Sequence, residues 1–411
     1  MTRVLLILFF CINALISFSQ QRGLDFFISQ SITNSPLIRD LQNQAGSNRL
    51  DSLLILAEQR PQVSLTSNNM VAPVVNGFGY DKAITNGANV TELLAVNKSL
   101  LNGKANKIQF TNLGLLSASL KNNIAVTEQD IKKSVIGQYI ITYGDLLQVS
   151  FSRELQQTLL KQESILKKLT EKNVYRQVDY LSFYVTLKQN EFKLKQQLIQ
   201  YKNDYSLLNY IAGISDTSQP AIDEPLISIN ILPGINESIF FKKYEIDSLK
   251  LVINKSLVDI GYRPKLNAFA DAGYNSSLAY KPYKNFGASF GLNLIVPLYD
   301  GRQKRLQYNK IAIQENTRLA NKKFFTDQYY QQLSQLYQQL KATDELTVDI
   351  NLQLKYIQAL ITANEKLLQT GDVRIYDYIL SLNNFLNAKN LINENTINRL
   401  QIINQINYWN R

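Results

Sequence analysis

The sequence contains two copies of one unit, and this duplication limits the possible folds more than any other feature. Matching residues lie 198 positions apart at both ends of the span from 102 to 210, although many positions between them do not match, so no net insertion separates the copies there. The matched pairs include Tyr139 and Tyr337, Arg176 and Arg374, Asp179 and Asp377, Tyr180 and Tyr378, and Tyr210 and Tyr408. Upstream, Arg60-Pro61 matches Arg263-Pro264 at an offset of 203, so the first copy is longer there. Both copies must therefore build the same elements in the same order.

The stretch from 286 to 304 shows what one unit contains. Apolar residues alternate with small or polar ones from Phe286 to Val296, the period of two of a strand with one apolar face. Pro297 ends this strand because it has no N–H to donate. Asp300 then stands where it can cap a very long helix. A buried strand of a sandwich is the alternative interpretation of the same alternation.

Each copy is predicted to hold a short helix, a strand hairpin and a long helical hairpin. In the first copy, residues 20–37 look like a polar lead-in, and Leu50, Leu53 and Leu54 mark one face of a short helix over 41–59. Glu92 interrupts the strand expected over 88–98. The predicted divisions are a signal peptide 1–19, a first repeat 20–211 with hairpins at about 61–98 and 104–211, a linker 212–236, and a second repeat 237–411 with hairpins at about 264–297 and 301–411.

The long helices carry coiled-coil seams, which we interpret as packing surfaces. One seam has a spacing of four and three and consists of Leu155, Leu159, Gln162, Leu166 and Leu169. The first helical hairpin reverses at Asn173 and the second at Gly371, and both residue types tolerate the left-handed backbone that such a turn needs.

Composition excludes several classes of function. The 411 residues include no histidine, and the single cysteine, Cys11, lies in the expected signal peptide. Histidine-based catalysis, histidine metal sites and disulfides are therefore not expected, and no cofactor or metal is predicted. The formal charge of +11 is spread along the helices without interleaved aromatic residues. A solvated helix surface explains this pattern better than nucleic-acid binding.

The sequence also predicts export and contact with a membrane. Arg3 precedes an apolar run from Val4 to Ile16, as in a signal peptide, and this run is short for a membrane anchor. No later segment is apolar for long enough to span a bilayer as a helix. Four strands cannot close a barrel alone, since single-chain barrels need at least about eight. Either several chains pool their strands, or the strands lie in water against another surface; the export signal favours the pooled barrel.

Three further motifs carry a resemblance. They are the Arg-Pro before each first strand, the run Val296-Pro297-Leu298-Tyr299-Asp300-Gly301, and the segment LLQTGDVRIYDYIL from Leu367 to Leu380. Together with the duplication, they make the chain resemble the TolC-type outer-membrane efflux protein family across nearly all of its expected mature length.

The resemblance implies a mainly α fold with a small β part. The duplicated unit would supply long coiled-coil helical hairpins and four amphipathic strands to a trimeric, 12-stranded transmembrane β-barrel. It implies a homotrimer in outer-membrane lipid, with a helical tunnel in the periplasm and with a periplasmic adaptor and an inner-membrane pump as partners. The function would be that of an exit duct for efflux or type I secretion, without enzymatic activity. A periplasmic coiled-coil adaptor or structural protein of an export complex is the alternative.

The resemblance also implies candidate site residues. Asp179 and Asp377 match charged residues that narrow the closed periplasmic tip, and Arg374 and Tyr376 match a possible latch between hairpins. Capping of a helix start is the alternative role for both aspartates. The expected strand-to-helix junctions are Asn102, Gly103, Pro297, Asp300 and Gly301.

Overall fold

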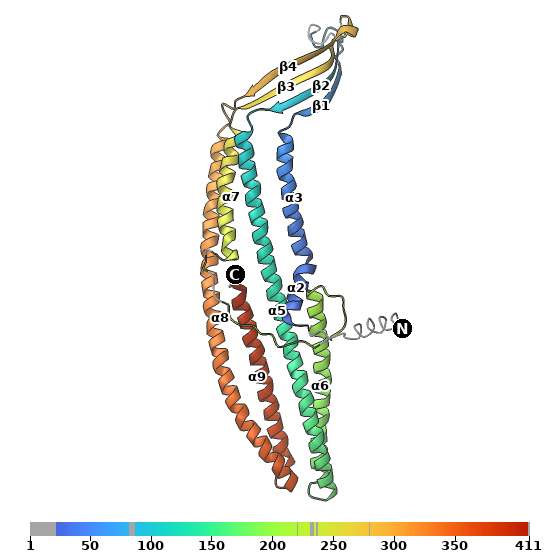
Figure 1. Cartoon of the computed structure of the whole chain (residues 1–411), viewed down its shortest axis with the longest axis vertical. Helices are drawn as coiled ribbons and strands as arrows, with labels where there is room; N and C mark the ends of the chain where they lie inside the picture. The colour runs from blue at the N-terminus through green and yellow to red at the C-terminus, as the bar shows by residue number, and fades with distance from the viewer. Residues whose placement is uncertain are drawn as a thin grey trace, which may run out of the picture. The chain divides into compact units, whose positions relative to one another are not determined.

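The computed structural model describes residues 22–81, 87–219, 221–230, 234–235, 237–278 and 280–409 (Figure 1). The expected signal peptide, including Cys11, lies outside the described residues. The helices and strands follow one another in this order: α2 (Leu24–Asn34), α3 (Pro36–Glu58), β1 (Gln62–Val71), β2 (Ala88–Ser99), α5 (Gly103–Glu171), α6 (Gln177–Ile211), α7 (Ile239–Gly261), β3 (Lys265–Ser276), the 3-10 turn η1 (Pro282–Lys284), β4 (Phe286–Ile295), α8 (Gln303–Thr370) and α9 (Ile375–Trp409).

The duplication is visible in the lengths of the elements. Helices α6 and α9 both have 35 residues and begin 198 positions apart. Helices α3 and α7 both have 23 residues and begin 203 positions apart, the offset seen upstream in the sequence. The repeat is therefore a repeat of structure, and each long helix is followed by a shorter return helix.

Contacts divide the chain into two compact units. The first contains residues 1–39, 125–240 and 325–411, and the second contains residues 40–124 and 241–324. The first unit holds α2, α6, α9 and the later parts of α5 and α8, and the second holds all four strands and most of α3 and α7. Each unit thus draws on both repeats.

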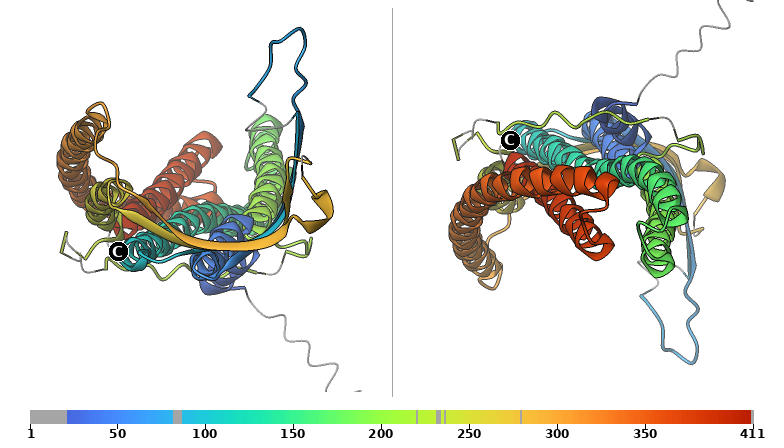
Figure 2. Two further views of the ribbon diagram at one scale, coloured as in Figure 1. Left: turned by 90° about the horizontal axis from the view of Figure 1, so that it is seen from above. Right: turned by 90° about the horizontal axis from the view of Figure 1, so that it is seen from below.

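In the second unit, the strands form one antiparallel sheet in the order β1-β2-β3-β4 (Figure 1). Seen end-on, the sheet is curved (Figure 2). Residues directly opposite each other share a face. One such row is Leu65, Leu94, Ala272 and Ala288, and the next is Val63, Val96, Ala270 and Phe290. The same face of β4 carries Phe286, Leu292 and Leu294, so one side of the sheet is largely apolar and exposed.

Glu92 is the charged residue that interrupts the apolar pattern of β2 in the sequence. It lies opposite Ser67 of β1 and Tyr274 of β3, on the apolar face. Its Oε1 accepts hydrogen bonds from Ser67 Oγ at 2.7 Å and from Asn69 Nδ2 at 3.1 Å. These two donors satisfy part of the carboxylate, which explains how β2 continues through this position.

In the first unit, the two helical hairpins pack through several apolar clusters. The cluster nearest the hairpin turns draws on α5, α6, α8 and α9 and consists of Leu155, Leu159, Leu166, Tyr175, Phe183, Leu187, Leu368, Ile375, Tyr378 and Leu382. Three seam leucines of α5 are thus buried, as predicted. The rings of Phe183 and Tyr378 stack with centres 6.2 Å apart, which joins α6 to α9.

The segment 20–37 looked like a polar lead-in in the sequence, but its residues from 24 to 34 form α2, and α3 begins at Pro36. Phe27 of α2 is fully buried, and its ring lies 5.8 Å from that of Tyr139 and 6.1 Å from that of Tyr205. Arg22, just before α2, pairs with Asp216 after α6. Leu24 and Ile28 of α2 pack against the same cluster, and Asn34 Nδ2 donates to the carbonyls of Ala212 and Gly213, both at 3.1 Å. This helix is therefore held by partners that lie far from it in the sequence.

The expected packing face of α3 is not covered within the chain. Leu50, Leu53 and Leu54 are each more than half exposed, although their spacing is that of a buried helix face. Asn48, by contrast, is buried and donates to the Leu113 carbonyl at 2.9 Å. In a single copy of the chain, a polar side chain therefore makes the contact between α3 and α5.

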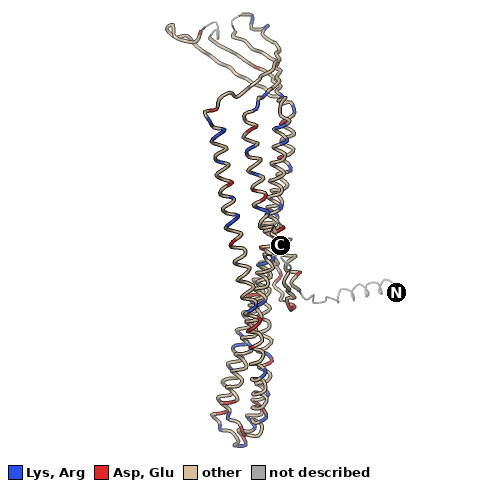
Figure 3. Tube along the Cα trace, turned by 90° about the vertical axis from the view of Figure 1, so that its left-hand side faces the viewer, with Lys and Arg blue, Asp and Glu red and all other residues tan. Residues whose placement is uncertain are grey.

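Charged side chains of both signs are spread along the helices and are not gathered on one patch (Figure 3). This distribution fits the prediction of a solvated helix surface. Among the described helices, none is both long and apolar enough to cross a membrane.

Candidate functional site

Both helical hairpins reverse through the same hydrogen-bonded turn. Asn173 has φ +61° and Gly371 has φ +84°, so the predicted left-handed residues are confirmed at both positions. Beyond the turn, Val174 N donates to Leu169 O and Asp372 N to Leu367 O, each at 2.9 Å. Such a bond, closing over a left-handed residue, satisfies carbonyls that the end of a helix leaves free.

The two turns also touch each other. The Tyr175 hydroxyl donates to the carbonyl oxygens of Leu368, at 3.3 Å, and Val373, at 3.0 Å. A Cβ atom added to Gly371 would lie 2.7 Å from Cγ1 of Val174. Burial raises the pKa of Tyr175, so its hydroxyl stays protonated as the donor of these bonds. The tip of one chain is thus a paired structure made by both repeats.

The two candidate gate aspartates are engaged at the starts of their own helices. Asp179 Oδ2 lies 3.1 Å from Nε of Arg176, and Asp377 Oδ2 lies 2.7 Å from Nε of Arg374. Asp179 also accepts a bond from the backbone N of Arg176 at 3.3 Å, so its carboxylate satisfies a free N–H group at the start of α6. This geometry is that of the capping interpretation, and a gating role for the same carboxylates stays a prediction.

The other two candidate residues at the tip are Arg374, which forms an ion pair, and Tyr376, which is exposed to solvent. Arg374 binds Asp377 of its own hairpin, so its guanidinium group is not linked to the neighbouring hairpin. Tyr376 is 70% exposed. A latch between hairpins is therefore not formed by these side chains within one chain, and it stays a prediction for an assembly.

Two tyrosine–glutamate pairs next to the tip were not found from the sequence. Tyr180 donates to Glu163 at 2.6 Å, and Tyr378, its match in the second repeat, donates to Glu365 at 3.3 Å. The bond to Glu163 raises the pKa of Tyr180 to about 12. The tyrosines match across the repeat, but the two glutamates come from different positions, so the offset of 198 could not reveal them.

The predicted strand-to-helix junctions form in both repeats. Asp300 accepts bonds from the backbone N of Arg302 at 2.9 Å and of Lys304 at 2.7 Å, as expected for a helix cap. Gly301 has φ +63° and Arg302 has φ +71°, so two successive left-handed residues turn the chain after Pro297 into α8. The bond to Lys304 lowers the pKa of Asp300.

The first-repeat junction uses different bonds. Asn102 Oδ1 accepts a bond from Ser99 Oγ at 2.9 Å, and α5 begins at the next residue, Gly103. No left-handed residue is needed here. The side chains at the two junctions therefore differ, although both turn a strand into a long helix.

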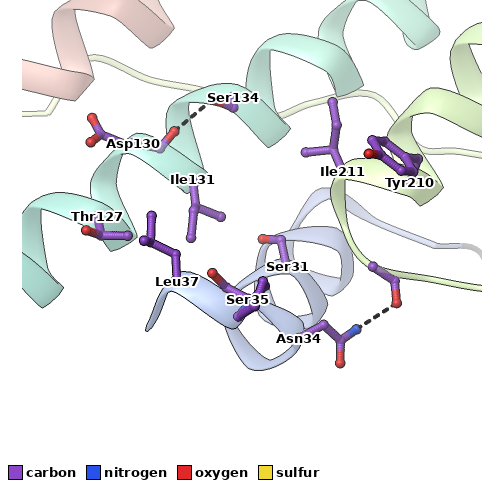
Figure 4. A pocket seen from close by; sticks show the side chains of 12 residues that line it. Ser31, Asn34, Ser35, Leu37, Thr127, Asp130, Ile131, Ser134, Tyr210 and Ile211 are labelled. Carbon is purple, nitrogen blue, oxygen red and sulfur yellow. Dashed lines mark hydrogen bonds between the residues drawn. The ribbon is translucent and has the colours of Figure 1, made fainter. Parts of the chain in front are cut away.

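A hollow of about 370 Å³ lies in the first unit between α2, α3, α5 and the end of α6 (Figure 4). Its lining includes Leu37, Thr127, Ile131, Tyr210 and Ile211. In the second repeat, the matching positions of four of these carry large rings: Phe240, Phe325, Tyr329 and Trp409. The ring centres of Phe240, Phe325 and Tyr329 lie 5.1 Å to 6.2 Å from that of Trp409. Aromatic rings therefore occupy, in the second repeat, the positions that line the hollow in the first.

Asp145 is a half-buried carboxyl group on α5, and its Oδ2 has no partner among the described residues. Burial and the nearby Asp204 raise its pKa to about 7. Asp204 itself accepts a bond from Gln200 at 2.6 Å. Asp145 is therefore protonated in the folded chain at a pH where an unfolded chain would carry it charged.

We expect Asp145 to make stability depend on pH. Since its folded pKa is raised, its favourable contribution is present in acid and is lost as the pH rises through about 7. Asp145→Asn should weaken this pH dependence and stabilise the protein by about 1 kcal/mol at pH 8. This free energy is smaller than the raised pKa alone implies, because solvent screens a half-buried carboxylate. Thermal unfolding at pH 5 and pH 8 measures the effect, with the exposed Asp349→Asn as control. An equal pH response in all three proteins would contradict the assignment.

In the described residues, no group of three or more acidic, cysteine or histidine side chains could hold a metal ion.

The chain matches neither a protein-family model nor a curated protein. A comparison with solved structures does give matches. CusC superposes with a TM-score of 0.74 at 10% sequence identity, covering 95% of this chain and 92% of that one.

The chain has the TolC-type channel fold. The outer-membrane protein VceC of Vibrio cholerae has a TM-score of 0.71 at 12% identity and covers 94% of this chain and 96% of its own. The MtrE outer-membrane channel of Neisseria gonorrhoeae has a TM-score of 0.72 at 9% identity, over 94% of this chain and 88% of its own. The TolC-type fold thus extends over nearly the whole chain, so the fold that the resemblance implied is confirmed.

Proposed function

We propose that this protein is an outer-membrane channel that serves as the exit duct of a tripartite efflux or type I secretion system. The observation that carries the proposal is the four-stranded sheet, which has one largely apolar, exposed face and sits in a TolC-type fold. Such a face is stable against lipid and costly in water. The solved structures with this fold include channels of the outer membrane.

The sheet supports a barrel that is pooled between chains. Its edge strands, β1 and β4, each have one side without a partner in the described chain. An open edge is not tolerated in hydrocarbon, because the unpaired N–H and C=O groups have no water there. Three chains, each giving four strands, close a twelve-stranded barrel and leave no edge, and this homotrimer places the helical hairpins in the periplasm.

A groove near the second hairpin supports a protein partner. It has a volume of about 760 Å³ and runs along α8 and onto α9, lined by Asn351, Leu354, Lys355, Gln358, Ala359, Thr362, Ala363, Lys366 and Lys389. Its three lysines form no ion pair with the described residues, so the groove suits a helix with acidic side chains. We assign the periplasmic adaptor to this end of the molecule, with the inner-membrane pump beyond it.

The apolar sheet face also favours the channel over the alternative function. A periplasmic coiled-coil adaptor would keep its whole surface in water, where exposed Phe286, Phe290, Leu292 and Leu294 on one strand would favour aggregation. Both candidate functions use the helical hairpins, but only the channel uses this strand.

For the tip, we propose that Asp179 and Asp377 narrow the tunnel in addition to capping their helices. In a homotrimer, six carboxylates would approach one axis, and charges about 6 Å apart interact by about 3 kcal/mol at an effective dielectric constant near 20. The double variant Asp179→Asn/Asp377→Asn should keep its fold and lose most of its cation selectivity. Single-channel recording at two salt concentrations measures this change, which should be larger at low salt.

The control for the gate is a variant that loses a carboxylate far from the tip. Asp349→Asn on α8 meets this condition, because Asp349 is exposed and lies far from the turns in the sequence. Asparagine also caps helices well, so a purely capping role predicts unchanged selectivity in the double variant. That result would remove Asp179 and Asp377 as the gate and leave Asp372 and Glu171 as candidates.

The proposed function is tested by export. Cells that lack the gene should accumulate a fluorescent efflux substrate or retain a secreted protein, and the intact gene should restore export to the parental level. A variant that lacks β1 and β2 should restore nothing, since it cannot complete the barrel. Normal export without the gene, for every substrate of the cognate pump, would contradict the proposal.

A further inference from the structure

The four points where strands meet helices lie at one end of the sheet. Strand β1 begins just after α3 and β3 just after α7, whereas β2 and β4 lead into α5 and α8. The antiparallel register places Gln62 opposite Asn97 and Lys265 opposite Ile295, so all four connections leave the sheet at the same end (Figure 1). We call this end, with its four connections, the helix end of the sheet.

The helix end carries unpaired positive charge. Six exposed basic side chains lie in or beside the connections: Arg60, Lys98, Arg263, Lys265, Arg302 and Arg305. None of the six forms an ion pair with the described residues, whereas the nearby Lys304 is held by Asp259 at 2.8 Å. These six charges are therefore available to a partner.

The acidic side chains at the helix end do not neutralise this charge. Asp259 is occupied by Lys304 and by the Tyr308 hydroxyl, and Asp300 is occupied by backbone N–H groups at the start of α8. Glu58, at the end of α3, is a third acidic residue. Positive charges thus outnumber negative ones at the helix end, although both signs are mixed along the helices (Figure 3).

Large apolar side chains are exposed at the same end. Leu298 and Tyr299, in the connection from β4 to α8, are 92% and 86% exposed, and their matches in the first repeat, Leu100 and Leu101, are exposed too. Such exposure is costly in water. At a membrane interface it is favourable, because a leucine can enter the hydrocarbon and a tyrosine ring lies at the level of the headgroups.

The apolar face of the sheet continues to the helix end. Leu292 and Leu294 of β4 and Val296 just beyond it share this face and are all exposed. The proposed function places this face in hydrocarbon, so the residues that follow Val296 reach the headgroups on the helix side of the bilayer. The described basic residues at the other end of the sheet, Lys281 and Lys284, instead lie 5.1 Å and 5.9 Å from the ring centres of neighbouring tyrosines.

We propose that the helix end of the sheet is a binding site for anionic phospholipid headgroups of the leaflet that faces the helices. The guanidinium groups of Arg302 and Arg305 bind the phosphate oxygens, and Leu298 and Tyr299 pack against the upper part of the acyl chains. A headgroup with a net negative charge fits this surface best, because a neutral headgroup leaves the repulsion between the basic side chains uncompensated. The proposal rests on the outer-membrane channel of the proposed function and names the lipid that the channel selects.

Native mass spectrometry of the purified protein tests this selection. The protein in mild detergent is incubated with equal amounts of phosphatidylglycerol and phosphatidylcholine that have the same acyl chains. One basic side chain near an anionic surface raises affinity about fivefold, so the wild type should retain phosphatidylglycerol in at least about fivefold excess. Arg302→Gln/Arg305→Gln should lower this ratio several-fold, and a higher concentration of ammonium acetate should lower it as well.

The matched control removes two exposed basic side chains from the other end of the sheet. Lys281→Gln/Lys284→Gln should keep the wild-type ratio of the two lipids. Equal retention of both lipids by wild-type protein with the mass of three chains, or an equal loss of preference in the control, would overturn the headgroup site while the trimer stands. A native mass of one chain would instead remove the trimer and with it the proposed function.

A second variant tests the apolar part of the site. Leu298→Ser/Tyr299→Ser should retain fewer phospholipids of both kinds, while the mass of three chains is kept and the preference for phosphatidylglycerol remains. Dissociation of this variant into single chains would show that another copy of the chain covers these two side chains. That result would overturn their assignment to lipid.

Discussion

Phe27→Ala is expected to destabilise the protein by about 3 to 5 kcal/mol, the cost of removing a large buried ring and leaving a cavity. Phe27 is fully buried, and its ring packs against those of Tyr139 on α5 and Tyr205 on α6. Loss of these contacts should release α2 and lower the midpoint of thermal unfolding by roughly 5 °C. The measurement is circular dichroism in detergent.

Phe26→Ala provides the matched control for this prediction. Phe26 is the neighbouring residue and the same kind of side chain, but it is 38% exposed. Its removal should cost well under half as much as removal of Phe27. Similar midpoints for the two variants would show that α2 contributes little to the fold of the first unit.

Gly371→Val is expected to open the tip with a local cost of about 2 kcal/mol or more. The residue has φ +84°, which is strained for a β-branched side chain, and its new Cβ would lie 2.7 Å from Val174 Cγ1. Because Val174 belongs to the other hairpin, both turns should loosen together. Trypsin should then cut next to Lys172 and Arg374 several-fold faster, and adaptor binding should fall while barrel assembly is retained.

The control for the tip is Gly114→Val in the first part of α5, far along the helix from the turn. A Cβ atom at Gly114 meets no other atom within 4 Å, and its φ is that of an ordinary helix. This variant should leave tip proteolysis unchanged. Equal proteolysis of the wild type and Gly371→Val, or loss of assembly and adaptor binding together, would contradict the local account of the turn.

The duplicated sequence predicted much of this fold because both copies obey the same local physics. Alternation located β4, Pro297 located its end, and the turn residues Asn173 and Gly371 were identified from their tolerance of the left-handed backbone. The match of Arg60-Pro61 with Arg263-Pro264 placed the short helices, which have equal lengths in the structure. These features depend on neighbours in the sequence.

Features that depend on distant partners were not predictable in the same way. Helix α2 is held by Phe27 and by the pair of Arg22 with Asp216, and neither signal repeats along the chain. The exposed Leu50 and its neighbours on α3 show the reverse case, since a correct helical period does not reveal whether the partner surface lies in the same chain. The role of Asp179 was left open for the same reason: its cap is local, and a gate needs other copies.

The conductance of the purified protein in planar bilayers tests the central claim most directly. If three chains pool their strands into one barrel, the protein should insert from detergent and give uniform single-channel steps with a preference for cations. A variant with charged residues on the apolar face, Leu292→Glu/Leu294→Glu on β4, should give no steps although its helices form. Absence of channels from folded wild-type trimers, or equal conductance from the variant, would contradict the account.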